Sequence, residues 1–251
     1  MNIDAYLKRI NYHAPLTPAA ETLRDLQVAH LLNVPFENLS IHSGEQIVLD
    51  DEALFAKIVE KRRGGFCYEV NGLFASLLRA LGFEVSMLAA EVCNSEGEFG
   101  PEFDHMTLMV TLEQRWLVDV GFGDSFMEPL LLDERGEQVQ GCGVFQIVEV
   151  DGRLLLRRRN EGGDWRPLYR FTLQPHGYAD YDEMCRYHQT SPESHFTKGR
   201  ICSLATPDGR VTISNMRLIT TSSSGARNEQ ELQNHDEYDR ILRDQFGIVM
   251  K

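Results

Sequence analysis

Cys67, His105 and Asp119 are the side chains whose types and order could carry covalent chemistry. A cysteine nucleophile needs a histidine that takes its proton and a third group that fixes the imidazole tautomer. Cys67 follows two glycines in segment 63–74, whose apolar residues recur at helical spacing, so it lies in the first turn of an expected helix. Unpaired N–H groups there favour a thiolate, and a neighbouring imidazolium would lower the thiol pKa. The pattern predicts a Cys–His–Asp triad.

Two β-strands are expected to bring the histidine and the aspartate together. His105 precedes the strand-like run 106–112, and Asp119 lies near the end of the run 115–120. Neighbouring strands of a hairpin place the start of one beside the end of the other, which suits a hydrogen-bonded His–Asp pair. Asp104 and Asp124 stay open as rival orienting acids.

Three regions differ in their patterns. Residues 1–82 are expected to form a small helical bundle: one helix stops before Pro35, a second is capped by Asp50 or Asp51, and the cysteine helix ends at Gly82. A turn or loop is expected over 33–40. Residues 83–190 carry short alternating runs separated by turns at Asp151-Gly152 and Glu161-Gly162-Gly163, which predict an antiparallel sheet or barrel.

The C-terminal region, residues 191–251, mixes both kinds of pattern. After a short helix around 181–188, strands are expected at 201–205 and 211–219, with a turn at 207–209 between them. A final helix is expected from about Glu229 to Leu242. These regions make an α+β fold.

Composition excludes several classes of protein. The 251 residues carry 25 Lys and Arg against 38 Asp and Glu, a net charge of −13, which opposes binding to nucleic acid or to anionic membranes. Residues 1–8 lack the basic and apolar segments of a signal peptide. The five cysteines are an odd number and widely spaced, which indicates free thiols and a cytoplasmic protein.

Three motifs resemble those of the arylamine N-acetyltransferase family. They are Val34-Pro35-Phe36-Glu37-Asn38-Leu39, the segment Arg63-Gly64-Gly65-Phe66-Cys67-Tyr68-Glu69 with Asn71-Gly72, and Asp119-Val120-Gly121-Phe122-Gly123. Weaker matches flank them, so that the resemblance extends over nearly the whole chain. A set of motifs in the correct order is far more specific than any one of them.

The resemblance implies a cysteine-proteinase-like fold of three parts: an N-terminal helical bundle (1–82), a central antiparallel β-barrel (83–190) and a C-terminal α/β lid (191–251). It also implies that Cys67 takes an acetyl group from acetyl-CoA with the help of His105 and Asp119. The acetyl group would then pass to an arylamine, arylhydrazine or N-hydroxyarylamine, as in xenobiotic metabolism. Phe36 and Phe122 resemble positions that line the substrate pocket.

Other residues allow two interpretations each. Arg63 and Glu37 are expected to form an ion pair that positions the cysteine helix, an interpretation preferred over contact with the substrate. The run Arg157-Arg158-Arg159 could meet CoA phosphates, although a solvated strand end is the preferred interpretation. Cys185, His188, His195 and Cys202 could in principle bind zinc, but their spacing is irregular and no metal is predicted. No nucleotide-binding glycine motif occurs, so the residues that hold CoA stay undefined.

Two further functions stay open at this point. One is an amide synthase of natural-product biosynthesis on the same fold, which the triad alone does not distinguish from an acetyltransferase. The other is a non-catalytic binding module, which an intact Cys67, His105 and Asp119 disfavours. The preferred acceptor and the oligomeric state have no signature in the sequence.

Overall fold

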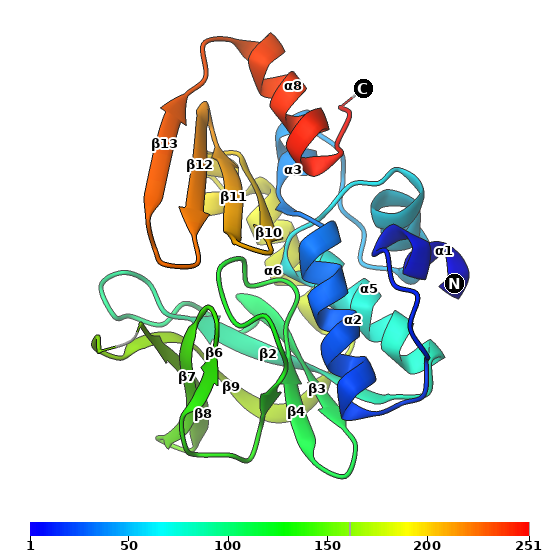
Figure 1. Cartoon of the computed structure of the whole chain (residues 1–251), viewed down its shortest axis with the longest axis vertical. Coiled ribbons are helices and arrows are strands. Elements are labelled where there is room, and N and C mark those ends of the chain that lie inside the picture. Colours follow the sequence, from blue (N-terminus) through cyan, green and yellow to red (C-terminus); the bar gives the residue numbers. More distant parts are fainter. Residues whose placement is uncertain (161, 251) are drawn as a thin grey trace.

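The computed structural model describes residues 1–160 and 162–250 and has three structural parts (Figure 1). Helices of the N-terminal part lie along one side, an eight-stranded sheet forms one end, and a five-stranded sheet lies at the other. The fold is α+β with a nearly closed antiparallel barrel, as the sequence predicted. None of the helices in the described ranges is long and apolar enough to cross a membrane.

The N-terminal part is helical and surrounds one buried helix, α5. Its helices are α1 (Ile3–Arg9), α2 (Ala20–Asn33), α3 (Leu39–Ser43), α4 (Asp51–Phe55), η1 (Ala56–Glu60) and α5 (Cys67–Ala80). Asp50 caps α4 through its side chain, and Gly82 takes a φ of +93° just after α5, both as expected. The loop expected over 33–40 is wrong in part, because strand β1 (Phe36–Glu37) and the start of α3 lie there.

The central sheet has the strand order β5-β4-β3-β2-β9-β8-β7-β6, and all its pairings are antiparallel. Its strands are β2 (Glu84–Val92), β3 (His105–Thr111), β4 (Arg115–Val118), β5 (Leu130–Leu131), β6 (Gln138–Gln140), β7 (Gly143–Val150), β8 (Arg153–Arg159) and β9 (Arg166–His176). Asp151 and Gly152 both have positive φ, which makes the predicted tight turn between β7 and β8. Glu161, in the next predicted turn, lies outside the described residues.

Side-chain amides close the barrel where backbone pairing stops. Gln138 of β6 accepts a hydrogen bond from Leu131 N–H of β5 at 2.8 Å and donates one to Leu131 O at 2.9 Å. Gln140 likewise accepts from the N–H groups of Met127 and Glu128. An amide side chain thus replaces a neighbouring strand and satisfies backbone groups of the edge strands.

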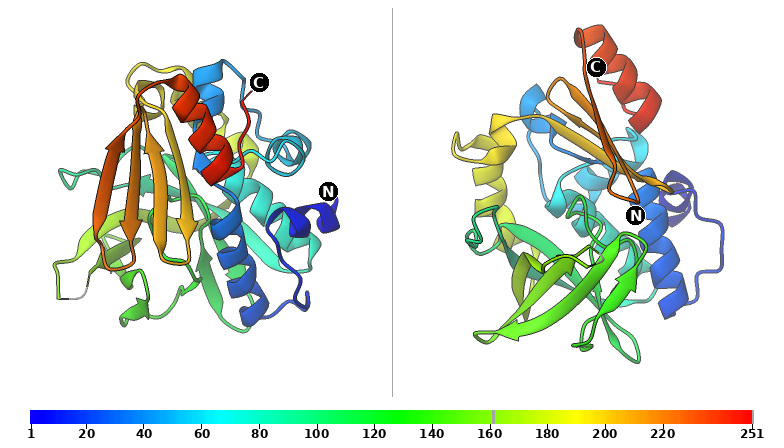
Figure 2. Two further views of the ribbon diagram at one scale, coloured as in Figure 1. Left: turned by 45° about the horizontal axis from the view of Figure 1, so that its top comes forward. Right: turned by 60° about the vertical axis from the view of Figure 1, so that its left-hand side comes forward.

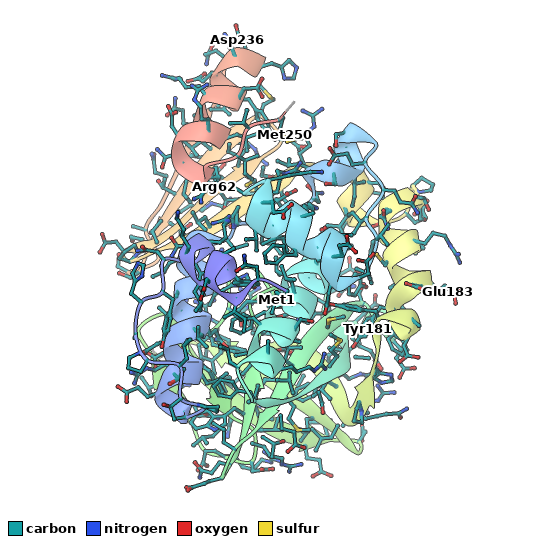
Figure 3. The ribbon with its side chains drawn as sticks, turned by 90° about the vertical axis from the view of Figure 1, so that its right-hand side faces the viewer. Met1, Arg62, Tyr181, Glu183, Asp236 and Met250 are labelled. Atoms are coloured by element: carbon teal, nitrogen blue, oxygen red, sulfur yellow. The ribbon has the colours of Figure 1, made fainter. Side chains whose placement is uncertain are left out.

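The lid sheet has the order β1-β10-β11-β12-β13, in which strand β1 comes from the N-terminal region. Helices α6 (Tyr178–Thr190) and α7 (His195–Lys198) lead from β9 to this sheet. Its other strands are β10 (Ile201–Thr206), β11 (Gly209–Ser214), β12 (Arg217–Ser222) and β13 (Arg227–Glu231), and α8 (His235–Phe246) follows the last of them. Helix α8 packs on one face of this sheet through buried apolar side chains (Figure 2). Helix α6 points Tyr181 inward and Glu183 to solvent (Figure 3).

Two expectations for the lid are wrong. The single strand expected at 211–219 is broken into β11 and β12, because Asn215 adopts a φ of +52° and turns the chain. The final helix starts at His235 rather than near Glu229, since residues 227–231 form the edge strand β13. Asn234 caps the helix by accepting the N–H of Glu237.

Candidate active site

Cys67 occupies the first position of α5, and its side chain is buried at 2% exposure. Burial raises the pKa of its thiol, the carboxylates of Asp104 and Asp119 raise it further, and the backbone amide of Met106 lowers it. Met106 directly follows His105, so the thiol lies beside the chain that carries the histidine. An isolated thiolate is therefore costly here, and its formation requires a proton acceptor that becomes a nearby cation.

The two glycines before Cys67 bring two distant segments of chain together. A Cβ on Gly64 would lie 1.9 Å from Pro35 O, and a Cβ on Gly65 would lie 2.6 Å from the Cβ of Glu69. This space lets Glu37 N–H donate to Gly65 O at 3.0 Å. Glycine is required at both positions because no side chain fits.

Ion pairs fix the entry to α5. Arg63 Nε donates to Glu37 Oε1 at 2.9 Å, and both side chains are buried, which confirms the predicted pair. Glu69, in the first turn of α5, accepts from Phe66 N–H at 3.1 Å and from Lys57 Nζ at 2.6 Å. These contacts hold the start of the helix from two sides.

His105 and Asp119 meet through the hairpin of β3 and β4. Leu108 pairs with Val118, so the same register places Asp119 opposite Thr107. His105 lies two residues before Thr107 on the same strand, and side chains two residues apart point to the same face of a sheet. His105 Nε2 lies 2.6 Å from Asp119 Oδ2. The predicted closeness of histidine and aspartate is observed, and it leaves Nδ1 as the ring nitrogen not bonded to the carboxylate.

Further groups converge on Asp119. Its Oδ1 accepts from Asn71 Nδ2 at 2.9 Å and from Gly121 N–H at 2.8 Å, and its Oδ2 accepts from the hydroxyl of Tyr169 at 3.1 Å. Burial alone would raise the pKa of Asp119, but His105, Asn71 and the Gly121 amide together hold it below the usual value. The carboxylate therefore stays ionised next to the imidazole.

Gly121 has no side chain, which allows the segment after β4 to lie directly against Cys67. A Cβ at this position would lie 2.8 Å from the Cα of Cys67 and 2.8 Å from Asn71 Nδ2. Asn71 also accepts the N–H of Val120 at 2.8 Å and donates to Met106 O at 2.6 Å. The side chain of Asn71, one turn after Cys67, thus ties the nucleophile helix to both strands of the hairpin.

The rival acids have other partners. Asp104 Oδ1 lies 3.2 Å from Nε2 of His188, and Asp124 Oδ2 lies 3.2 Å from Nη1 of Arg158. Asp119 is the carboxylate hydrogen-bonded to His105.

The two predicted pocket residues lie in different places. The Phe122 ring is partly exposed and packs 5.1 Å from the His105 ring and 4.9 Å from that of Tyr169, measured between centroids. Phe36, in β1, is also partly exposed and lies 6.2 Å from the ring of Phe196. Phe122 is thus next to the imidazole.

The arginine run of β8 is engaged within the barrel. Arg157 binds Gln146 and covers the ring of Trp165 at 4.6 Å, and Arg159 pairs with Glu137 at 2.9 Å. The five cysteines are free thiols. Within the described ranges, no three His, Cys, Asp or Glu side chains are grouped so as to hold a metal ion.

Sequence reasoning missed Tyr169 and Gln27 as partners of Asp119. Gln27 in α2 is fully buried; its Oε1 accepts from Asp119 N–H at 3.3 Å, and its Nε2 donates to Met127 O at 3.1 Å. These residues lie 50 and 92 positions from Asp119 in sequence and carry no local signature. The one available signal was an amide residue among the leucines of the α2 pattern, a face that also carries Thr22 and His30.

Comparison with known proteins identifies close relatives. The family model described as N-acetyltransferase matches residues 19–251. The chain is 35% identical to the arylamine N-acetyltransferase pineal gland isozyme NAT-10 of Gallus gallus and 34% identical to arylamine N-acetyltransferase 1 of Homo sapiens. Each alignment covers 100% of this chain and 95% of the relative.

Solved structures give the same answer. The arylamine N-acetyltransferase of Mycobacterium marinum superimposes with a TM-score of 0.91 at 32% identity, over 98% of this chain and 93% of that one. The same enzyme in complex with CoA superimposes with a TM-score of 0.90, also at 32% identity and with the same coverage.

Proposed function

Because the chain belongs to the arylamine N-acetyltransferase family, we propose that it transfers acetyl from acetyl-CoA to arylamines, arylhydrazines or N-hydroxyarylamines through an acetyl-Cys67 intermediate. The observation that best supports these roles is the hydrogen-bonded pair of His105 and Asp119, on a strand whose next residue, Met106, has its backbone amide beside the Cys67 thiol. The CoA-bound relative supports CoA as the carrier of the donor acetyl group.

In the first half-reaction, His105 Nδ1 takes the proton of the Cys67 thiol as the sulfur attacks the carbonyl carbon of the thioester. The positive imidazolium then faces the developing negative charge, which offsets the cost of burying it. The tetrahedral intermediate collapses, the bond from carbon to the CoA sulfur breaks, and His105 returns its proton to that sulfur. CoA leaves as a thiol, and Cys67 carries the acetyl group.

In the second half-reaction, the amine nitrogen attacks the acetyl carbonyl of the Cys67 thioester and gives its proton to His105. The bond between carbon and Cys67 Sγ breaks, and His105 reprotonates the thiolate. The backbone N–H of Cys67 at the start of α5 is the candidate donor to the oxyanion in both steps, because the first amides of a helix have no partner within it.

Asp119 and its partners act on the imidazole rather than on the substrate. The carboxylate fixes the hydrogen on Nε2 of His105 and stabilises the imidazolium, while Asn71 and Tyr169 orient the carboxylate. Phe122 lies against the His105 ring and is the proposed wall of the acceptor site. Phe36, whose ring lies beside that of Phe196, is proposed as a substrate-pocket residue on the family resemblance alone.

An intact-mass measurement tests the intermediate. Incubation with acetyl-CoA and no acceptor should add one acetyl group to the protein and none to Cys67→Ala. Cys93→Ala is the matched control, because Cys93 is a partly exposed thiol that should not carry the adduct. An adduct that survives in Cys67→Ala, or no adduct on the natural chain, would refute the proposal. A panel of arylamines and hydrazines, assayed by CoA release, then defines the acceptor.

A further inference from the structure

A second histidine and carboxylate lie close together near the proposed nucleophile. His188 of α6 is 2% exposed, and its Nε2 lies 3.2 Å from Oδ1 of Asp104, which precedes β3. Its Nδ1 lies 3.1 Å from Oγ of Ser194, the N-cap of α7. The catalytic scheme above uses neither His188 nor Asp104.

The carboxylate of Asp104 favours one tautomer of His188, because a lone pair on Nε2 would face a carboxylate oxygen at 3.2 Å and be repelled. The histidine hydrogen then resides on Nε2. Ser194 Oγ accepts the N–H of Phe196 at 3.2 Å and donates its own hydrogen to Nδ1 in this tautomer. Nε2 is buried, and its contact with Asp104 is close but not aligned as a full hydrogen bond. The contact is therefore mainly electrostatic.

His188 and Asp104 lie beside residues that adjoin Cys67 and His105 in sequence. Phe66 and Tyr68 flank Cys67, and their ring centroids lie 6.5 Å and 6.0 Å from that of His188. Tyr68 also donates its hydroxyl hydrogen to Phe103 O at 2.6 Å, one residue before Asp104. Helix α6 is thus linked by packing to the chain on either side of Cys67 and, through Asp104, to the chain just before His105.

The carboxylate of Asp104 is confined between two elements. Its Oδ1 faces His188, while its Oδ2 occupies space that a Cβ on Gly100 would enter at 2.8 Å. The negative charge of Asp104 raises the pKa of the Cys67 thiol. Any group that moves or screens this charge will change how readily the nucleophile ionises.

We propose that His188 is a positioning residue that acts on Cys67 through Asp104: the dipole of its Nε2–H lies against the carboxylate and weakens the field that this charge exerts on the thiol. The role in catalysis rests on the proposed function, since it assumes that Cys67 is the nucleophile. Asp104 is the residue through which helix α6 influences nucleophile ionisation.

Other charged and titratable groups face the same two sites. Asp104, Asp119 and Cys185 act on the thiol of Cys67, together with the Met106 amide. His188 is faced by Asp104, by Tyr68 of α5, by Tyr187 of its own helix and by His195 of α7. Burial lowers the pKa of His195, so that ring is uncharged in the range where a thiol titrates.

The test measures ionisation of Cys67 directly. Its rate of alkylation by iodoacetamide is followed against pH by mass spectrometry of the Cys67 peptide, which needs no acetyl-CoA. Asp104→Asn should move the midpoint to lower pH by about 0.5 to 1, and His188→Phe should move it to higher pH by a similar amount. In the double variant the midpoint should equal that of Asp104→Asn alone. His195→Phe, the control, should leave it unchanged.

The double variant distinguishes this role from general loosening of the fold. A shift in the same direction for both single variants, or a further shift when His188→Phe is added to Asp104→Asn, would overturn the inference. If His188→Phe fails to fold, His188→Gln replaces it under the same criteria. Alkylation that behaves as expected in a protein that takes no acetyl group would support the coupling while refuting the proposed function.

Discussion

The two oxygens of Asp119 have separate tasks, and this division makes the aspartate hard to replace. Oδ1 receives the N–H groups of Asn71 and Gly121, while Oδ2 faces His105 and Tyr169. Both partners of Oδ1 donate hydrogen bonds, so only an acceptor atom such as oxygen is stable at that position. These two donors therefore determine which atom of a substituted side chain faces the imidazole.

Asp119→Asn should keep the fold but slow acetylation of Cys67 by about 10³- to 10⁴-fold. The donors Asn71 and Gly121 would hold the amide oxygen at the Oδ1 position, so the NH₂ group would point at Nε2 of His105. Nε2 would then have to accept a hydrogen bond, and the ring hydrogen would move to Nδ1, where it prevents the ring from accepting the thiol proton. Rapid-quench intact mass gives the rate.

Asp124→Asn is the matched control for this change. Asp124 is an exposed carboxylate five residues later in the same loop, paired with Arg158 rather than with a histidine. Its variant should acetylate at nearly the natural rate. An Asp119→Asn rate close to that of the control would mean that another acid orients His105.

Residue order carried most of the information about this site. Cys67, His105 and Asp119 each follow from a local pattern, a helix start or the ends of a hairpin, and the structure brings His105 and Asp119 into contact. Tyr169 and Gln27 could not be predicted in the same way. Their contacts with Asp119 depend on how β9 and α2 pack against the hairpin, which no local pattern specifies.

At the scale of elements, buried ion pairs determine where α5 begins. Glu37 comes from β1, and Arg63 comes from the segment before α5, so their pair joins the lid sheet to the nucleophile helix. Glu37 also accepts the N–H of Leu39 at 2.6 Å. Removal of Glu37 would leave the buried charge of Arg63 with only a longer contact to the exposed Glu45.

Glu37→Gln should lower the free energy of unfolding by about 3 kcal/mol, because Arg63 would lose its buried carboxylate and keep only the exposed Glu45, 3.5 Å from its Nη1. Asp133→Asn breaks an exposed pair with Arg115 and should cost less than about 1 kcal/mol. Urea unfolding of both variants measures the contrast. Equal losses for the two variants would show that the Glu37 pair does not stabilise the start of α5.

Secondary structure was predictable where local signals agreed. Glycine 82, the Asp50 cap and the Asp151-Gly152 turn marked boundaries that the structure reproduces. The break at Asn215 was not predictable from alternation alone, because Asn adopts positive φ only where tertiary packing favours a turn. Strand β13 is exposed along its whole length, so it lacks the apolar alternation that would distinguish it from a helix start.

At the scale of the whole molecule, the parts are joined by contacts distant in sequence. Phe36 and Glu37 pair with Ser203 and Cys202, which makes a piece of the N-terminal region the edge of the lid sheet. The division into 1–82, 83–190 and 191–251 therefore stays a prediction about sequence regions. A two-residue strand has too little pattern to reveal such a link.

Stability of the whole molecule should depend on a histidine outside the site. His30 of α2 is fully buried, with its Nδ1 3.0 Å from the Tyr6 hydroxyl and its ring 5.1 Å from that of Phe74. Burial, aided by the charge of Arg9, lowers its pKa to about 3. The ordinary pKa of histidine is about 6.5, so between these values the unfolded chain binds a proton that the folded chain does not.

The free energy of unfolding should consequently fall as the pH drops from about 6.5 towards 3, with His30 contributing a loss on the order of 4 kcal/mol. His30→Gln removes the titration and keeps an acceptor for Tyr6, so its unfolding free energy should vary less over this range. His13→Gln changes an exposed histidine and should retain the natural dependence. Urea unfolding at several pH values gives the slope of the unfolding free energy against pH for each variant. An equal slope for the His30 and His13 variants would mean that burial of His30 does not couple stability to pH. The acid sensitivity would then arise from the carboxylates.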